Sequence, residues 1–342
     1  MIRTVELHTA GEPVRIVVDG LPPIPGATIL EKRRYAREHL DGLRRALMAE
    51  PRGHADMYGV WPVEPDLPDV DLAVLFLHNE GFSTMCGHAT IALGRFAVEE
   101  GLVTVPAAAP GVTVEVPVRL QAPCGLIDVR VDVTDGRVGD VRFTSVPAFA
   151  AALDLAVDVD GVGRVVLDVA YGGAFYAVVA ADAVGVELGV TRLADVVDRA
   201  DAVSDAVRQA MRLEHPDADD LAFLYGTIVV DAPDAAAPDL SHNVCVFADR
   251  QVDRSPTGSG VTARMALRHA RGSVRVGEPR RFAGVSGEEF TATVVAEHPA
   301  GTNAPDGIAS VEVQVAGRAY RTGASMFLLE DDDPLREGFL PR

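Results

Sequence analysis

The stretch Met85-Cys86-Gly87-His88-Ala89-Thr90 decides the fold, and it has a counterpart in Asp253-Arg254-Ser255-Pro256-Thr257-Gly258-Ser259-Gly260. Each stretch follows an apolar run typical of a buried strand and precedes apolar residues at helical spacing. In each, a residue with a nucleophile-type side chain, Cys86 or Thr257, comes directly before a glycine. The pattern predicts two copies of a unit in which a strand leads into a helix that begins at the nucleophile position.

The ends of the two predicted helices match as well. Gly101 and Gly272 stand at equal distances after Cys86 and Thr257, and glycine is common just beyond a helix C-terminus. Cys86 and Thr257 are themselves separated by half of the 342 residues of the chain. We therefore expect two domains of similar fold whose helix N-termini face each other across a cleft.

A nucleophile-type residue at a helix N-terminus has a specific chemical consequence. The unpaired N–H groups and the positive end of the helix dipole bind anions and favour an ionised thiol. Cys86 is therefore expected to be partly thiolate near neutral pH and able to act as a base, and the N–H groups after Cys86 and Thr257 could hold a substrate carboxylate between them. The alternative is an inert buried thiol, but the neighbouring Gly87-His88 and the mirrored half-site favour a catalytic role.

The two motifs together resemble the proline racemase family, whose members need no cofactor and have a fold similar to that of diaminopimelate epimerase. This resemblance implies an α+β fold of two pseudo-symmetric domains, each a mostly antiparallel β-barrel around a central helix. Residues 1–135, completed by 325–342, would form the N-terminal barrel domain carrying Cys86. Residues 136–324 would form the C-terminal barrel domain carrying Thr257, with the active site in the cleft between the two. Further segments that carry the resemblance follow in order along the chain: His8-Thr9-Ala10-Gly11-Glu12-Pro13, Glu50-Pro51-Arg52-Gly53-His54, Ala170-Tyr171-Gly172-Gly173-Ala174-Phe175-Tyr176 and Asp331-Asp332-Asp333-Pro334-Leu335-Arg336.

The resemblance also implies a reaction. The family includes proline racemases, 4-hydroxyproline 2-epimerases and trans-3-hydroxy-L-proline dehydratases. Racemases and epimerases carry cysteine at both nucleophile positions, whereas Thr257 matches the pattern of the dehydratases. Cofactor-independent elimination of water from trans-3-hydroxy-L-proline, giving Δ1-pyrroline-2-carboxylate with Cys86 as the catalytic base, is therefore expected. Three alternatives stay open: a 4-hydroxyproline 2-epimerase or proline racemase-like isomerase, a catalytically silent amino-acid binding protein on the same fold, and a cysteine hydrolase, which the mirrored half-sites do not support.

The same motifs supply the expected substrate-binding residues. Asp253 could accept hydrogen bonds from the secondary ammonium of a proline-type substrate, or it could cap the helix. His88 could donate to the substrate or tune the thiol, or it could be a satisfied histidine in the first turn. No metal and no cofactor is expected. The complete expected set is Cys86 as the catalytic residue with Gly87, His88, Asp253, Thr257, Gly258 and Ser259 as substrate contacts.

Bulk properties limit the partners and the compartment. A chain of 342 residues is long enough for two domains with a core each. The formal net charge of −19 disfavours nucleic acid and anionic membranes as partners, because both attract basic surfaces. Without an apolar run long enough to span a bilayer or a signal-peptide pattern, a cytoplasmic location is expected. Cys86, Cys124 and Cys245 lack metal or disulfide spacing, and the family resemblance suggests a homodimer that binds a small hydroxyproline substrate.

Local patterns predict several other elements. Residues 31–49 have the composition and apolar spacing of one continuous helix. From residue 112 to 133, β-branched runs alternate with Pro and Gly, as in an antiparallel sheet, and Asp135-Gly136 is a typical hairpin turn. Residues 319–322 are predicted to be a strand of the second domain, and residues 325–329 a separate last strand of the first.

Overall fold

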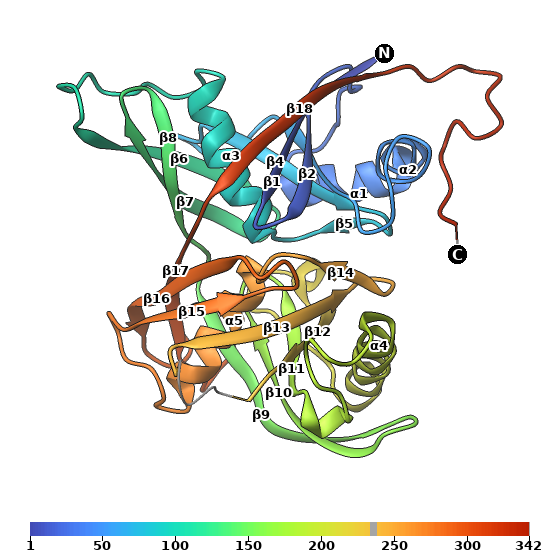
Figure 1. Cartoon of the computed structure of the whole chain (residues 1–342), viewed down its shortest axis with the longest axis vertical. Helices are drawn as coiled ribbons and strands as arrows, with labels where there is room; N and C mark the ends of the chain where they lie inside the picture. The colour runs from blue at the N-terminus through green and yellow to red at the C-terminus, as the bar shows by residue number, and fades with distance from the viewer. Residues whose placement is uncertain (233–237, 342) are drawn as a thin grey trace. The chain divides into compact units, whose positions relative to one another are not determined.

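The computed structural model describes residues 1–232 and 238–341. The chain forms two compact units (Figure 1), which differ in colour along most of their length. Unit 1 comprises Met1–Phe143 together with Gly317–Arg342, and unit 2 comprises Thr144–Ala316. Unit 1 is therefore built from both ends of the chain, and unit 2 from its middle.

Unit 2 is a closed barrel of mostly antiparallel strands. Neighbouring strands pair in the order β9, β10, β11, β12, β13, β15, β16 and β17, and β17 pairs with β9 to close the ring. Among the strand pairs that the described residues of unit 2 form, only β11–β12 and β13–β15 are parallel, and the short β14 pairs antiparallel with β13. The elements are β9 (Ala148–Val159), β10 (Gly163–Tyr171), β11 (Phe175–Ala180), α4 (Leu193–Ala210), β12 (Leu224–Val230), β13 (Leu240–Phe247), β14 (Gln251–Asp253), α5 (Gly258–Ala270), β15 (Pro279–Ala283), β16 (Glu289–His298) and β17 (Ser310–Gly317), with short 3-10 helices at Asp182–Val184 and Asp219–Leu221.

Unit 1 repeats this pairing pattern. Its strands pair in the order β18, β1, β2, β3, β4, β6 and β7, and the β2–β3 and β4–β6 pairs are parallel, like their counterparts in unit 2. The pseudo-symmetry predicted from the two helix motifs thus extends to the strands, and the predicted α+β fold is confirmed. The elements are β1 (Ile2–Thr9), β2 (Glu12–Asp19), α1 (Ile29–His39), α2 (Asp41–Met48), β3 (Tyr58–Val63), β4 (Leu72–His78), β5 (Phe82–Ser83), α3 (Gly87–Glu99), β6 (Thr113–Ala122), β7 (Gly125–Thr134), β8 (Arg137–Thr144) and β18 (Ala319–Phe327).

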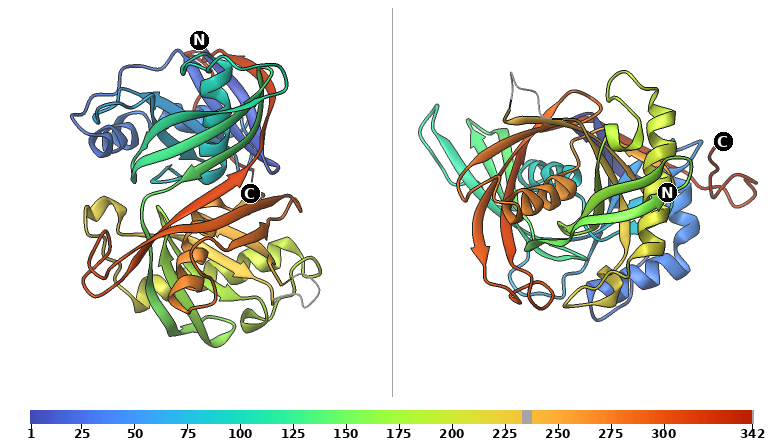
Figure 2. Two further views of the ribbon diagram at one scale, coloured as in Figure 1. Left: turned by 90° about the vertical axis from the view of Figure 1, so that its left-hand side faces the viewer. Right: turned by 90° about the horizontal axis from the view of Figure 1, so that it is seen from below.

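Each unit has one helix enclosed by its strands. Helix α5 contacts β9, β10, β11 and β16, and the right-hand view of Figure 2 shows it inside the ring of strands of unit 2. Helix α3 likewise contacts β1, β2, β6, β7 and β18 in unit 1. Close approach requires small residues: a Cβ on Gly94 of α3 would lie 2.8 Å from a side-chain carbon of Val141. The central helices therefore pack directly against the barrel walls.

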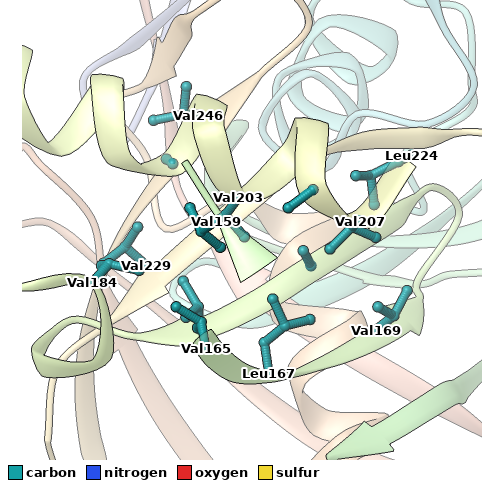
Figure 3. Packing of buried hydrophobic residues seen from close by; sticks show 14 of the residues in the cluster. Val159, Val165, Leu167, Val169, Val184, Val203, Val207, Leu224, Val229 and Val246 are labelled. Carbon is teal, nitrogen blue, oxygen red and sulfur yellow. The ribbon is translucent and has the colours of Figure 1, made fainter. Parts of the chain in front are cut away.

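The core of unit 2 extends to the outer face of its sheet. Successive side chains of a strand point to opposite faces. Strand β10 contacts α5 inside the barrel, and its Val165, Leu167 and Val169 belong to an apolar cluster that includes residues of α4. Figure 3 shows this outer cluster, in which apolar residues of the strands meet one face of α4. Its members include Val159, Val165, Leu167, Val169, Val203, Val207, Leu224, Val229 and Val246.

The predicted starts and ends of the central helices are confirmed. Helix α3 begins directly after Cys86 and α5 directly after Thr257. Gly101 and Gly272, just beyond their ends, both have φ +68°, the left-handed conformation in which glycine commonly ends a helix. No helix in the described part of the chain is long and apolar enough to cross a membrane.

The single helix predicted for residues 31–49 is wrong. The segment forms two helices, α1 and α2, which are separated at Leu40 with φ −122° and ψ 12°. Asp41 and Gly42 are weak helix formers, and the carbonyl of Leu40 starts a new helix by accepting from the N–H of Leu43 at 3.0 Å. The apolar spacing continues across this break, so periodicity alone did not reveal it.

The two strands predicted near the C-terminus are also wrong. Residues 319–327 form one continuous strand, β18, which pairs with β1 of unit 1 along its whole length. Gly323 looks like a break in the sequence, but it pairs with Glu6, and the register shift beside it leaves Thr322 as one extra residue. Such a bulge bends a strand without ending it.

Candidate active site

Cys86 is the residue that caps helix α3. Its backbone is extended, with φ −147° and ψ 111°, and its Sγ atom accepts a hydrogen bond from the N–H of Ala89 at 3.4 Å. The hydroxyl of Thr90 donates to the carbonyl oxygen of Cys86 at 2.7 Å and so fixes the same turn. A thiol here takes the place usually held by Ser, Thr, Asp or Asn. The sulfur lies where helix N–H groups favour negative charge.

His88 lies beside the thiol. Its Nδ1 atom is 3.2 Å from Sγ of Cys86 and its Nε2 atom is 3.7 Å away. Both residues are buried, with 4% of Cys86 and 2% of His88 exposed. An imidazole N–H pointing at the sulfur would stabilise a thiolate, and an unprotonated ring nitrogen could accept the thiol proton. The pair can therefore share a proton in either direction.

Residues outside the predicted set hold the histidine in place. The hydroxyl of Thr9 donates to the carbonyl oxygen of His88 at 2.8 Å, and the Tyr58 ring meets the His88 ring edge-on with centroids 4.8 Å apart. Tyr58 in turn is hydrogen-bonded through its hydroxyl to Ser83. Tyr58 and Ser83 are not among the predicted site residues, because their only signal in the sequence is a polar group next to apolar residues.

Thr257 stands at the equivalent position of α5, but its geometry differs from that of Cys86. Its φ is 66° and its ψ is 89°, an unusual conformation for a β-branched residue. Its side chain forms no capping hydrogen bond, and the buried Oγ1 has no hydrogen-bond partner among the described residues. Backbone strain and an unsatisfied buried hydroxyl are both typical of functional positions. The two half-sites are therefore similar in fold and different in chemistry.

Asp253 supports the loop that leads to Thr257. It ends β14, is 6% exposed, and accepts a hydrogen bond from the N–H of Ser255 at 2.8 Å through Oδ1. The hydroxyl of Ser255 then accepts from the N–H of Thr257 at 3.1 Å. Oδ1 of Asp253 thus has a structural role, because it accepts a backbone hydrogen bond just before the helix, as a capping residue would. The second oxygen, Oδ2, is the one expected to contact a substrate.

The first turn of α5 is tightly packed. Gly258 begins the helix, and the hydroxyl of Ser259 is hydrogen-bonded to the hydroxyl of Tyr176 at 2.7 Å. A Cβ on Gly172 would lie 2.3 Å from the carbonyl oxygen of Ser259, and a Cβ on Gly260 would lie 3.1 Å from Cγ2 of Thr257. Tyr176 and Gly172 belong to the segment Ala170–Tyr176, which carries the family resemblance but was not among the predicted site residues.

The predicted site residues thus form two groups, each at one helix N-terminus. Unit 1 brings Cys86, Gly87 and His88 together, and unit 2 brings together Asp253, Thr257, Gly258 and Ser259. The other two cysteines are also buried, and desolvation raises the pKa of Cys124 to about 12. Within residues 1–232 and 238–341, no group of three or more His, Cys, Asp or Glu side chains is arranged to hold a metal ion.

Both units have the same strand pairing, and in each a loop leads into the buried N-terminus of the central helix. This arrangement is the proline racemase-like fold. The chain belongs to the proline racemase family, whose model, described as "Proline racemase", matches residues 4–340. The chain is 52% identical over 342 residues to a trans-3-hydroxy-L-proline dehydratase of Homo sapiens, covering 99% of this chain and 94% of that protein. It is 41% identical over 343 residues to a 3-hydroxyproline 2-epimerase of Burkholderia multivorans, covering 100% and 98% of the two chains. Among solved structures, it is similar to a probable proline racemase from Agrobacterium radiobacter with bound carbonate, with a TM-score of 0.90, 28% identity and coverage of 100% of this chain and 97% of that one.

Proposed function

We propose that the protein is a trans-3-hydroxy-L-proline dehydratase, a hydro-lyase that removes water from its substrate. The observation that carries this proposal is Thr257 at the position equivalent to Cys86, where two-base racemisation would need a second thiol. The 52% identity to the human dehydratase, over nearly the whole of both chains, supports the same assignment.

The stereochemistry of the substrate explains why one thiol is enough. In trans-3-hydroxy-L-proline the hydroxyl is trans to the carboxylate, so it lies on the same ring face as the α-hydrogen. A single group on that face can remove the proton and assist the departure of the hydroxyl. Racemisation differs, because its proton leaves one face and returns on the other.

Cys86 performs both proton transfers in this mechanism. Its thiolate removes the α-proton, so that the C–H bond breaks, an S–H bond forms, and the electron pair is delocalised into the carboxylate. The pair then forms the C2–C3 double bond while the C3–O bond breaks, and the thiol returns its proton to the departing hydroxide. Water leaves, the thiolate is restored, and the enamine product tautomerises to Δ1-pyrroline-2-carboxylate.

His88 and the helix end support the charge on sulfur. Nδ1 of His88 lies 3.2 Å from Sγ, and the N–H of Ala89 donates to Sγ at 3.4 Å. A thiolate beside such donors costs less free energy than one in an apolar environment. Cys86 is a thiolate at the start and at the end of each turnover, so this stabilisation acts at both points.

We further propose that the two half-sites act together on one substrate. The N–H groups of Gly87, His88, Gly258 and Ser259 bind the substrate carboxylate and stabilise the charge that develops on it, as in an oxyanion hole. Asp253 accepts hydrogen bonds from the secondary ammonium. The equivalent positions of Cys86 and Thr257 in two barrels of one pairing pattern support this arrangement.

A hydroxyproline epimerase is the second candidate, which the 41% identity to a 3-hydroxyproline 2-epimerase favours. Epimerisation needs an acid or base on each face of the α-carbon. The hydroxyl of Thr257 is a weak acid and a weak base near neutral pH, so dehydration suits these residues better. The Cys86–His88 pair likewise argues against a catalytically silent binding protein.

One experiment separates these functions. The purified protein is incubated with trans-3-hydroxy-L-proline and, separately, with L-proline, and the products are identified by mass and chirality. We expect loss of water from the first and no change in the second. Conversion of the first compound to its 2-epimer, or racemisation of L-proline, would assign an isomerase. Binding of either compound without any product would assign a binding protein.

The homodimer and the cytoplasmic location expected from the sequence stay predictions. Light scattering of the purified protein measures its mass directly, against 36.2 kDa for one chain. Fractionation of cells that produce the protein tests the location.

A further inference from the structure

Arg264 is a buried cation in the body of helix α5, behind Thr257. It is 4% exposed, and its guanidinium lies over the ring of Phe282, 4.7 Å from the ring centre. No carboxylate within the described ranges forms an ion pair with it. Burial lowers the pKa of the Arg264 guanidinium, and the nearby Arg268 acts in the same direction. A buried charge without an opposite partner destabilises a fold, so the position of Arg264 needs another explanation.

The hydrogen bonds of Arg264 determine the orientation of Asn243. One guanidinium nitrogen, Nη1, donates to Oδ1 of Asn243 at 2.8 Å, and Nδ2 of Asn243 donates to the carbonyl oxygen of Pro256 at 3.2 Å. Arginine can only donate and a carbonyl can only accept, so the amide satisfies both neighbours in one orientation alone. Asn243 is 2% exposed, so little of its side chain is open to solvent.

A second branch holds the guanidinium itself. Its other terminal nitrogen, Nη2, donates to the hydroxyl of Ser241, which donates to Oδ1 of Asp231 at 3.3 Å. Asp231 is the acidic group that raises the pKa of Arg264 against the effect of burial. Asp231 therefore compensates the charge of Arg264 only through Ser241. The direct hydrogen bonds of Arg264 go to the uncharged side chains of Ser241 and Asn243 and orient them.

The carbonyl of Pro256 belongs to the peptide bond that leads into Thr257. Thr257 has φ 66°, and a β-branched residue keeps such a conformation only where its surroundings hold it. On the other side, the carbonyl oxygen of Thr257 accepts from the N–H of Val261 at 2.7 Å. The bonds from Arg264 through Asn243 to Pro256 thus connect the middle of α5 with the peptide bond that precedes Thr257, the residue before the helix.

We propose that Arg264 is a positioning residue for the dehydration, an inference that rests on the proposed function for its effect on turnover. Through Asn243 it orients the peptide bond before Thr257, and with it the N–H groups of Gly258 and Ser259. These N–H groups then point at the substrate carboxylate as charge develops on it. Arg264 itself does not touch the substrate.

The substitution Asn243→Asp separates positioning from folding. Its carboxylate would pair directly with Arg264, which compensates the buried charge, but it cannot donate to the carbonyl of Pro256. We expect a protein that melts close to the wild type and has a kcat at least about tenfold lower, because misplaced donors lose transition-state stabilisation. KM should change less than kcat, since the N–H groups act most strongly on the transition state.

Two substitutions of the arginine and one control complete the series. Arg264→Met removes both hydrogen bonds and should lower kcat at least as far as Asn243→Asp. Arg264→Lys keeps one donor for Asn243 and should retain an intermediate kcat, so it carries the test even where Arg264→Met fails to fold. The matched control is Arg268→Met, on the same helix and over the same Phe282 ring at 5.4 Å. This control should leave kcat and KM unchanged.

Hydrogen–deuterium exchange of the segment 251–262 provides a readout that does not depend on turnover. We expect faster exchange in Asn243→Asp and Arg264→Met, and wild-type exchange in Arg268→Met. Should the wild type leave trans-3-hydroxy-L-proline unchanged, the proposed function fails, and this exchange decides the positioning separately. Wild-type exchange and wild-type kcat per folded molecule in Asn243→Asp and Arg264→Lys would overturn the inference. An equal loss of kcat in Arg268→Met and Arg264→Met would overturn it as well.

Discussion

The Sγ atom of Cys86 and the Nδ1 atom of His88 lie 3.2 Å apart at the N-terminus of α3, and both side chains are buried. The N–H of Ala89 approaches the same sulfur at 3.4 Å. A ring nitrogen and a backbone amide thus converge on one sulfur atom. A serine hydroxyl in this position would find the same partners, but it would not ionise near neutral pH.

The first prediction follows from this difference. Cys86→Ser should keep the fold, because the hydroxyl can accept from Ala89 and cap α3 as serine commonly does. Turnover of trans-3-hydroxy-L-proline should fall by about 10²–10⁴-fold or more, the usual range for a lost general base. Steady-state kinetics and circular dichroism measure the two effects. A variant that keeps a tenth of the activity would remove Cys86 from the mechanism.

The second prediction concerns the reactivity of the three buried cysteines. Iodoacetamide should alkylate Cys86 fastest, because the helix end and His88 favour its thiolate. Cys124 should react slowly, since desolvation raises its pKa to about 12 and leaves it protonated at neutral pH. Peptide mass spectrometry after limited labelling measures the order, and pyrrole-2-carboxylate should protect Cys86. Equal rates at Cys86 and Cys245 would argue against ionisation at the helix end.

The third prediction tests the charge of Asp253. In Asp253→Asn, the amide oxygen can still accept from the N–H of Ser255, as Oδ1 does at 2.8 Å in the wild type. The melting temperature should therefore change little. Substrate affinity should weaken by about 1.5–3 kcal/mol, the worth of a hydrogen bond to a charged group. Calorimetric binding and thermal melting distinguish the roles: a lower melting temperature with unchanged affinity would make Asp253 purely structural.

The fourth prediction concerns stability in acid. Burial lowers the pKa of His78 to about 3, and the charges of Arg44 and Arg33 act in the same direction. Below about pH 6.5 the unfolded chain binds a proton that the folded chain does not, so stability is complete above this pH and is lost as the pH falls toward 3. This group alone should lower the free energy of unfolding by about 2 kcal/mol between pH 8 and pH 5.

Urea denaturation of the wild type and of His78→Gln at the two pH values measures this contribution. Glutamine keeps an acceptor for the N–H of Glu80, which bonds to Nδ1 of His78 at 3.2 Å. The variant should show a pH dependence smaller by about 2 kcal/mol. The same slope in both proteins would show that His78 does not titrate on unfolding.

The elements that could be predicted from the sequence are those with local signals. The starts and ends of α3 and α5 follow from Cys86, Thr257 and the glycines beyond them. Strand β9 could not be predicted, because residues 150–156 are rich in Ala and Leu and favour a helix. Its pairing with β10 and β17 overrides that preference.

The candidate site could be predicted only in part, for a similar reason. The residues proposed to contact the substrate lie within two short motifs, whereas the groups proposed to orient them lie outside these motifs. Arg264 stands among apolar residues of α5 and Asn243 beside Val244 in a buried strand, and a polar residue in such a place was the only signal. The conformation of Thr257 could not be predicted at all, since threonine rarely adopts a positive φ.

The last prediction is that Thr257 separates this protein from its racemising relatives. Thr257→Cys would place a thiol of similar volume at the start of α5, where the Oγ1 of threonine is buried and has no partner among the described residues. We expect the variant to exchange the α-proton of L-proline or 4-hydroxyproline with solvent and to form the D-configured product, because a second acid or base is then available. Dehydration of trans-3-hydroxy-L-proline should continue, since it requires only Cys86. Deuterium incorporation and the chirality of the recovered proline measure the gain, and Thr257→Ser is the control that should gain nothing. A Thr257→Cys protein that loses dehydration without gaining epimerisation would show that the threonine hydroxyl takes an active part in the elimination.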